Sequence, residues 1–200
     1  MLNFLLGIRI VFFDDQLGVD RVFASPGESW LFVCIGFGFF IFEESTLIYF
    51  DIRYKTLSKE LHLHHLVAVF GAFLTIYHNR GHYYAIRGFN LEFSTPFSCV
   101  CWCLLKLKLE KSYVWKINQG LLIYAFHFRT VYELHYVYEI YTNWTNVKQI
   151  PFLLLCNTLF GLILVTFWLT PYWTYRKTAQ YFNPTDWNME PEVNMKPKRR

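Results

Sequence analysis

The most constraining feature of this sequence is a series of five long apolar blocks separated by short polar loops. A helix needs about 20 predominantly apolar residues to cross the ~30 Å hydrocarbon core of a bilayer, and each block approaches that length. The expected spans are Trp30–Phe50, Leu61–Tyr77, Tyr83–Leu105, Val114–Tyr141 and Ile150–Trp173. Because backbone groups in lipid must be satisfied within the segment, each span should be a helix. The sequence therefore predicts an all-α, polytopic transmembrane helix bundle of about five full spans.

The basic residues are distributed unevenly among the loops. Thirteen of the 19 Lys and Arg residues fall in the loop after the first span, the loop after the third span and the C-terminal tail. The alternate loops contribute only Arg21, Arg80 and Lys148. Because basic loops stay on the cytoplasmic side, this alternation predicts a cytoplasmic C-terminus. It also argues against nucleic acid as a partner, since these cations mark membrane orientation rather than a basic binding face.

Composition agrees with a membrane-embedded chain. The sequence is 54% hydrophobic and only 17% charged, whereas soluble domains carry about a quarter charged residues. We divide the chain into three parts: residues 1–29, a partial N-terminal helix over Leu2–Phe13 and a luminal loop; residues 30–175, the transmembrane domain; and residues 176–200, a basic cytoplasmic tail.

The five cysteines are Cys34, Cys99, Cys101, Cys103 and Cys156, and they lie almost entirely inside the apolar blocks. An odd number at membrane depth argues against a disulfide framework. Cys99, Cys101 and Cys103 are spaced like a set of metal ligands, but only Cys99 and Cys103 would share one face of a helix. We therefore expect structural or lipid-facing cysteines and no metal site.

Many ionisable side chains lie inside the predicted spans, although a charge at the centre of a membrane helix costs roughly 2.5–3.5 kcal/mol on insertion scales. They are Glu43, Glu44, His64, His65, Arg87, Glu92, His127, Arg129, Glu133 and His135. At ~1.5 Å rise per residue, one subset can meet in the cytoplasmic half of the bundle. This subset is Glu44, His64, His65, Glu92, Thr95 and His127. A soluble cytosolic co-substrate could reach a site placed there.

Other intramembrane polar residues have simpler structural explanations. Arg129 and Glu133 are four residues apart on one predicted helix, where opposite charges neutralise each other. His62 and His135 are expected to be hydrogen-bonded packing residues, and Arg87 to snorkel toward the luminal side.

The short predicted luminal loop Thr142–Gln149 contains the sequon Asn143-Trp144-Thr145. This sequence makes Asn143 a predicted N-glycosylation site in a secretory-pathway membrane. The loop holds Asn143 close to the bilayer, which would restrict access of the transferase.

Several runs of residues resemble a known family. They are His64–Ala68, Asn79–Gly81, Leu91–Phe97, the longer run to Lys106, Trp115–Gln119, Phe126–Arg129, Pro171–Thr178 and Asn183–Asn188. Together these runs resemble the TLC-domain family, which includes the ceramide synthases, over about Trp30–Arg200. The resemblance implies a TLC transmembrane bundle. It also implies further spans before Trp30, so the chain is expected to be N-terminally shortened, with Leu2–Phe13 as the remnant.

The resemblance also implies a membrane acyltransferase that takes acyl-CoA as co-substrate and holds no tightly bound cofactor. His64 or His65 would act as nucleophile or general base, and Glu92 would orient the imidazole. The expected substrate-binding residues are Glu44, Thr95, Asn118, His127 and Arg129. Ceramide synthases have a His-Asp pair and a further Asp three residues on, where this chain has Leu91-Glu92 and Thr95. The expected acceptor is therefore a glycerophospholipid precursor.

Two other functions are consistent with the same resemblance. One is a cargo receptor that carries lysosomal enzymes from the endoplasmic reticulum to the Golgi, and the other is a lipid or ceramide sensor without turnover. Lys196 and Lys198 near the C-terminus resemble a dilysine retrieval signal read by the vesicle coat. The expected location is the endoplasmic reticulum membrane and the ER–Golgi intermediate compartment, and the expected partners are membrane lipids, vesicle coat machinery and lysosomal enzyme cargo.

Overall fold

The computed structural model describes residues 2–184, with side chains from residue 4 onward. Its elements are α1 Leu2–Phe13, α2 Asp15–Val19, α3 Gly27–Tyr54, α4 Lys59–His78, α5 His82–Phe89, the 3₁₀ segment η1 Asn90–Ser94, α6 Thr95–Lys106, α7 Tyr113–Thr142, α8 Trp144–Val147, α9 Phe152–Leu164, the π-helical segment η2 Val165–Leu169, and α10 Thr170–Phe182. No strand occurs in the described residues, and the prediction of an all-α bundle is confirmed.

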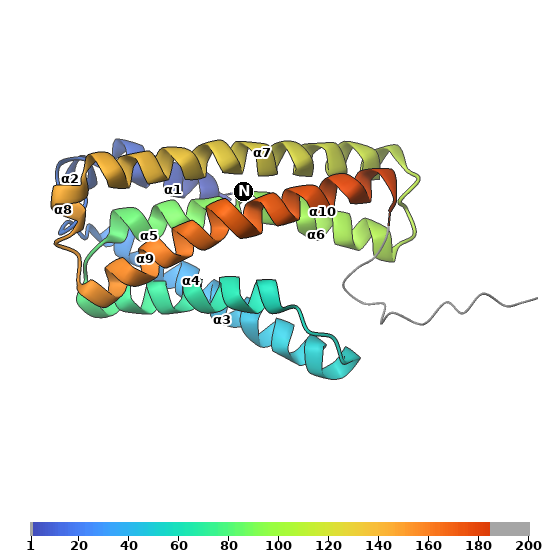
Figure 1. Ribbon diagram of the computed structural model, residues 1–200, viewed down its shortest axis with the longest axis horizontal. Helices are drawn as coiled ribbons and strands as arrows, with labels where there is room; N and C mark the ends of the chain where they lie inside the picture. Colours follow the sequence, from blue (N-terminus) through green and yellow to red (C-terminus); the bar gives the residue numbers. More distant parts are fainter. Residues whose placement is uncertain (1, 185–200) are drawn as a thin grey trace, which may run out of the picture.

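The long helices lie along one another in an elongated bundle (Figure 1). Three continuous helical stretches are long and apolar enough to cross a membrane: Gly27–Tyr54, Lys59–His78 and Phe152–Phe182. They coincide with the first, second and fifth predicted spans. The third predicted span is divided into α5, η1 and α6, and α7 is long enough but too polar to meet the same criterion. Crossing by these two segments, and the total of five, stays a prediction.

Prolines explain the two interruptions of the long helices. A proline lacks the backbone N–H and its ring clashes with the carbonyl of residue i−4, so a regular α-helix cannot run through it. Pro96 stands in the first turn of α6, directly after the tightened segment η1, and Pro171 stands in the first turn of α10, directly after η2. The first break changes the helix geometry where Glu92 is located, and helix irregularities of this kind are frequent at functional sites.

The turn between α3 and α4 sets the position of the first histidines. Lys55 adopts a left-handed conformation with φ 55° and ends α3. Asp51 then accepts hydrogen bonds from the Thr56 hydroxyl at 2.6 Å and the Ser58 backbone N–H at 2.8 Å. Because these contacts fix the start of α4 against the end of α3, the first turns of α4 are held beside the carboxylates of α3.

The bundle is polar inside at several depths and apolar outside. Large hydrophobic side chains are exposed along most helices, for example Phe42, Ile117 and Phe167 at 67%, 65% and 67% exposure. In contrast, Arg87 and Glu133 are fully buried. Exposed apolar side chains are unfavourable in water but favourable in contact with lipid. Charged side chains are costly in lipid, which explains why they are buried in the protein interior.

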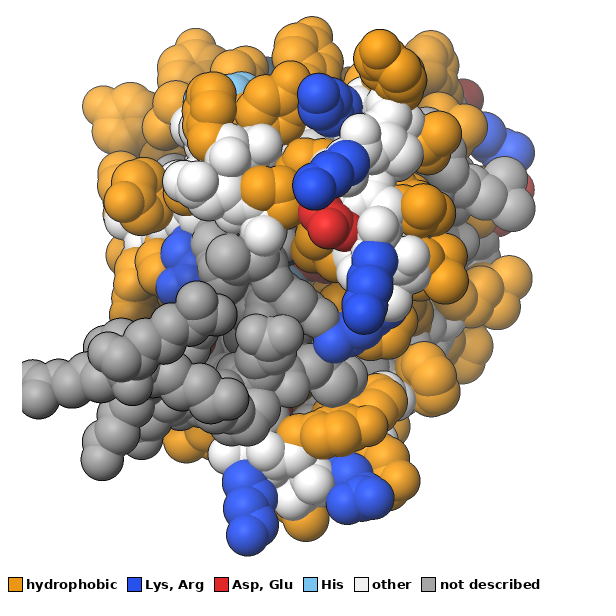
Figure 2. Space-filling model, turned by 90° about the vertical axis from the view of Figure 1, so that its right-hand side faces the viewer, with side chains coloured by type: hydrophobic (Ala, Val, Ile, Leu, Met, Phe, Trp, Pro, Cys, Tyr) orange, Lys and Arg blue, Asp and Glu red, His pale blue; other side chains and the backbone are white. Residues whose placement is uncertain are grey.

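We call the end that carries the α3–α4 turn, the α6–α7 loop and the last turn of α10 the basic end. Figure 2 views this end and shows Lys and Arg side chains gathered around it. Helix α10 continues to Phe182, beyond the expected start of the tail at residue 176, so Arg176 and Lys177 belong to the bundle. Lys196 and Lys198 lie outside the described residues, and the retrieval signal stays a prediction.

Candidate functional site

His64, Glu92 and Thr95 form a hydrogen-bonded group at the centre of the bundle. The Nε2 atom of His64, on α4, lies 2.9 Å from Glu92 Oε1, on η1. The Thr95 hydroxyl donates to Glu92 Oε2 at 2.5 Å from the first residue of α6. The edge of the His64 ring contacts Trp173 of α10, with ring centroids 5.5 Å apart. Depth along the helices predicted this meeting, and the structure confirms it.

His65 belongs to a second chain of acidic and imidazole groups. Its Nδ1 atom lies 3.2 Å from Glu44 Oε2, and Glu44 Oε1 lies 2.8 Å from His62 Nδ1. The His62 Nε2 atom in turn lies 2.9 Å from Asp51 Oδ2. A neutral imidazole carries only one N–H, so the two carboxylate contacts of His62 require a second proton shared within this chain. This series of contacts links the α3–α4 turn to the buried His65, and His62 makes the structural hydrogen bonds that were expected of it.

A polar cavity of about 370 Å³ lies between α4, α6 and α10 and reaches the basic end. Its lining includes both adjacent histidines and Glu92, together with a ring of charged and polar residues. These are Glu43, Ser58, Glu60, Ser94, Thr95, Ser98, Arg129, Tyr172, Arg176 and Lys177. The cavity can therefore admit a polar molecule to His64.

An apolar cavity of about 110 Å³ starts at His64 and Glu92 and continues between α4, α5 and α9. Along α4 it extends from His64 to Thr75, about 16 Å at the helical rise. Small residues line it, and a Cβ at Gly161 would lie 2.9 Å from Val67 Cγ1. Glycine at position 161 thus permits the close approach of α9 to α4 that shapes this narrow space.

Arg129 faces the polar cavity from α7 and is 2% exposed. Its Nε atom donates to Glu133 Oε1 at 2.9 Å, which confirms the predicted neutralising pair. Thr170 donates to the same carboxylate oxygen at 2.7 Å. Among the described residues, the Arg129 Nη2 atom has no hydrogen-bond partner. The guanidinium thus retains donor capacity beside the cavity.

Three predicted substrate-binding residues, His127, Asn118 and Glu44, line neither cavity. His127 is exposed on the outer face of α7 and lines neither cavity, so its expected meeting with His64 and Glu92 is wrong. It lies two residues from Arg129, about 200° around the helix, and therefore points in nearly the opposite direction. Asn118 is buried, and its amide nitrogen donates to the Phe97 carbonyl at 2.9 Å. It lines neither cavity and instead holds α7 against α6.

The structure adds residues that sequence reasoning did not assign. Glu43 lines the polar cavity, with its Oε2 atom 3.6 Å from His65 Nε2. Glu44, expected to bind substrate, lies behind His65 and positions it. The pair of adjacent acidic residues, Glu43 and Glu44, in the first predicted span was the sequence signal that could have identified Glu43 as a site residue. Arg176 and Lys177 had been assigned to the tail from their charge, and only the continuation of α10 shows that they line the cavity.

No arrangement for a metal ion is found in the described residues: no group of three or more His, Cys, Asp or Glu side chains is placed to hold one. Cys99 and Cys103 are exposed, whereas Cys101 is buried and its thiol lies 2.9 Å from Gln119 Oε1. The three cysteines therefore divide between the outer face of α6 and its packing face.

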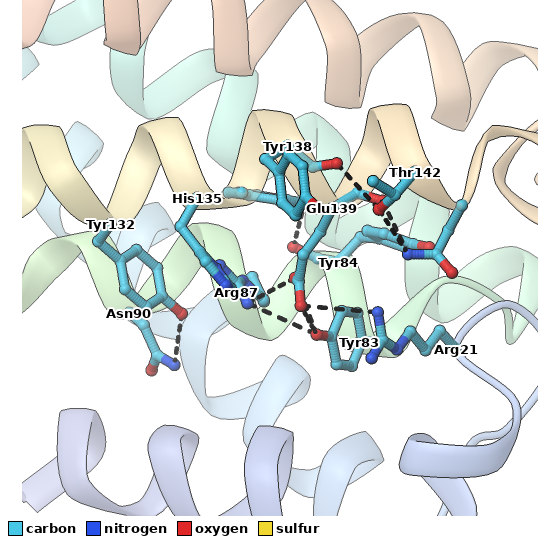
Figure 3. Close-up of polar contacts among 12 residues, drawn as sticks. Arg21, Tyr83, Tyr84, Arg87, Asn90, Tyr132, His135, Tyr138, Glu139 and Thr142 are labelled. Carbon is cyan, nitrogen blue, oxygen red and sulfur yellow. Dashed lines mark hydrogen bonds and ion pairs between the residues drawn. The ribbon is translucent and has the colours of Figure 1, made fainter.

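A separate buried network lies at the opposite end, around Arg87 (Figure 3). The Arg87 guanidinium pairs with Glu139 at 2.6 Å and contacts His135 Nδ1 at 3.0 Å. Its carbon Cζ lies 4.6 Å from the centre of the Tyr132 ring. Arg87 is fully buried, so the expectation that it snorkels outward is wrong. The partner on α7 makes burial less costly than extension toward the interface.

The expected glycosylation site stands at the end of α7 near this network. The Asn143 side-chain nitrogen donates to the Glu139 carbonyl at 2.9 Å and so caps the helix. Modification at this nitrogen would compete with the cap, and glycosylation of Asn143 stays a prediction.

Apolar helices long enough to cross a membrane, with charged side chains packed between them, are the features of a multi-pass membrane protein. The model of the TLC domain matches residues 2–177, and the chain belongs to the TLC-domain family. It is 36% identical to Protein CLN8 of Homo sapiens over 198 residues, covering 96% of this chain and 68% of that protein. It is also 36% identical to Protein CLN8 of Rattus norvegicus, covering 94% of this chain and 66% of the relative. The chain thus spans about two thirds of the length of these relatives. No solved structure matches the chain.

Proposed function

We propose that the protein is an acyl-CoA-dependent acyltransferase that acylates a glycerophospholipid precursor. One observation carries this proposal: the hydrogen-bonded pair of His64 and Glu92 lines both the polar cavity and the apolar cavity. An acyl-CoA has the same two parts, an anionic nucleotide portion and an apolar chain, and its reactive thioester lies where they join. The pair is located where such a thioester would be placed.

His64 is better placed to react than its neighbour. When the His64 Nε2–H donates to Glu92, its Nδ1 lone pair remains available as nucleophile or general base. Glu92 fixes the tautomer and stabilises the imidazolium that forms as the thioester carbon is attacked or the acceptor is deprotonated. His65 is 6% exposed, with its two ring nitrogens directed at Glu44 and Glu43, and supports the site from behind.

Cationic groups supply the remaining requirements of thioester chemistry. Arg176 and Lys177 line the polar cavity toward the basic end, where the phosphates of CoA would lie. The buried Arg129 guanidinium can donate to the thioester carbonyl as negative charge develops on its oxygen. In this account Thr95 assists Glu92, and the single carboxylate at this position supports a hydroxyl acceptor rather than a sphingoid amine.

The endoplasmic reticulum and ER–Golgi intermediate compartment, with a cytoplasmic C-terminus, are the proposed location. A cargo receptor is the second proposal from the same family. It would need luminal surface, and the connections at the end opposite the basic end, Asp14–Pro26, Asn79–Gly81 and Asn143–Pro151, would have to supply it. A lipid sensor would use the same two cavities without turnover.

A lipidomic comparison of cells with and without the chain tests the enzyme proposal. We expect one glycerophospholipid class to change in cells that lack the protein, and the wild-type chain to restore it. The His64→Ala/His65→Ala variant should be made at normal levels but should not restore it, because it removes the imidazoles that perform the chemistry. Full restoration by this variant would contradict the proposal and favour the receptor. In that case Lys196→Ala with Lys198→Ala should instead deplete lysosomal hydrolases.

A further inference from the structure

A third cavity reaches the same carboxylate from the side of the bundle. It has a volume of about 300 Å³ and lies between α1, α3, η1 and α6. Glu92 lines this cavity as well as the polar and apolar cavities, and no other residue lines all three. Glu92 is therefore located where the three cavities meet. Acyl-CoA as donor would occupy only the polar and the apolar cavity, so the third cavity has no assigned ligand.

The lateral cavity has a polar inner end and an apolar remainder. Its three polar lining groups are Glu43, Glu92 and Thr95, and all three also line the polar cavity. The remaining walls are apolar and largely aromatic, including Phe39 and Phe93. A molecule that fits this cavity has a long apolar portion and a polar group at the end that meets Glu92.

The mouth of the lateral cavity is at the surface that faces lipid. Ile35 of α3 is 48% exposed and Cys99 of α6 is exposed, and both line the cavity. The inner wall is formed by Phe89, and a Cβ at Gly36 would lie 2.5 Å from that ring. Glycine at position 36 thus leaves room for the aromatic wall beside α3. The route from membrane to Glu92 needs no passage through the aqueous end of the bundle.

Neither His64 nor His65 lines the lateral cavity. This observation indicates which of the two substrates, donor or acceptor, the cavity binds. The donor thioester must contact His64, and the apolar cavity that contains His64 extends in another direction, between α4, α5 and α9. An acceptor hydroxyl must reach the hydrogen-bonded pair that takes its proton, and Glu92, bonded to both His64 and Thr95, is the member of that pair at the inner end.

We propose that the lateral cavity binds the acceptor, a single-chain glycerophospholipid that enters sideways from the bilayer with its free hydroxyl toward Glu92. This proposal rests on the proposed transferase function. In the transfer, the bond from the acceptor oxygen to the acyl carbon forms and the acyl bond to the CoA sulfur is lost. The hydroxyl proton passes through the hydrogen-bonded pair of Glu92 and His64 to the leaving CoA sulfur, which departs as the thiol. The acyl chain of the acceptor stays between α1, α3 and α6 while the donor chain occupies the apolar cavity.

Cys99 and Cys103 offer a matched pair of positions for the test. Both are exposed on the same face of α6, one turn apart, but only Cys99 lines the lateral cavity. We expect Cys99→Trp to raise the KM for a lysophospholipid acceptor about tenfold more than the KM for acyl-CoA, because the indole occupies space needed by the acceptor chain. Cys103→Trp should leave both constants as in the wild type. Equal effects of the two variants, or an unchanged acceptor KM in folded Cys99→Trp, would overturn the proposal.

A binding measurement separates this inference from the proposed function. A lysophospholipid with a diazirine in its acyl chain is irradiated with the full chain in phosphatidylcholine vesicles, and adducts are mapped by mass spectrometry. Adducts on α1, α3 and α6, reduced in Cys99→Trp but not in Cys103→Trp, support the lateral site even if no transfer is detected. Adducts confined to α4, α5 and α9, or lateral adducts that an excess of unlabelled lysophospholipid does not reduce, overturn it. Lateral adducts without CoA release from acyl-CoA would contradict only the transferase.

Discussion

Replacing His64 by Gln is expected to lower kcat/KM for acyl transfer by about 10²–10⁴-fold, the usual contribution of a positioned acid or base. The amide of Gln can still donate to Glu92, which lies 2.9 Å from the His64 ring, so the fold should be retained. It cannot accept a proton or an acyl group as the imidazole Nδ1 atom can. The measurement is transfer from radiolabelled acyl-CoA to a lysophospholipid by purified protein in vesicles.

His127→Gln is the matched control for this prediction. The same substitution is made at an exposed histidine on the outer face of α7 that lines none of the three cavities. We expect its transfer rate to lie within about twofold of the wild type, as is usual for exposed positions outside a site. A loss of activity equal to that of His64→Gln would show that the substitution acts through something other than the site.

Replacing Glu139 by Leu is expected to destabilise the bundle by about 3–5 kcal/mol, the usual effect of leaving a buried charge without its partner. Arg87 is fully buried and its ion pair with Glu139 is 2.6 Å long. The reverse change, Arg87→Leu, should be milder, since the partly exposed Arg21 still lies 3.6 Å from Glu139. The measurement is the free energy of unfolding in mixed detergent micelles.

An exposed ion pair gives the control for that stability series. Arg9 and Glu28 pair at 2.7 Å with side-chain exposures of 63% and 56%, and Glu28→Gln should cost no more than about 1 kcal/mol. The double variant Arg87→Leu/Glu139→Leu should recover part of the loss in Glu139→Leu, because no charge is then left buried alone. If Glu139→Leu were as stable as Glu28→Gln, the buried network would have no structural role.

Sequence patterns located the helices well because apolar length is a strong signal. The expected start of the first span at Trp30 and the expected end of the fourth at Tyr141 lie within a few residues of the ends of α3 and α7. The break before Pro96 was not predicted, although the proline was visible. An apolar block predicts one membrane span, but whether that span is a continuous α-helix depends on local backbone geometry.

For the site, depth was predictable and direction was not. His64 and Glu92 were brought together correctly because their positions along the helices match. His127 has a suitable depth too, but its direction around α7 depends on which side of that helix packs inward. The neighbouring Arg129 takes the inward position because Glu133 and Thr170 satisfy it there. When polar and aromatic residues occur on all sides of a helix, a single sequence does not show which side faces the bundle interior.

Charge patterns had a similar limit. Arg176 and Lys177 were assigned to a tail, since basic residues after the last apolar block normally mark the cytoplasmic side. The structure extends α10 past them, and the same two cations line the polar cavity. One residue can thus contribute both to the orientation of the chain and to a binding site, and hydropathy does not distinguish the two.

The most direct test of the transferase proposal uses the purified chain alone in vesicles, with radiolabelled acyl-CoA and a lysophospholipid. The proposal predicts a labelled two-chain phospholipid and an equal amount of released CoA, and it predicts neither for the His64→Ala/His65→Ala variant. Folded wild-type protein that forms no labelled lipid from any glycerophospholipid precursor, or a double variant that forms it at the wild-type rate, would contradict the proposal.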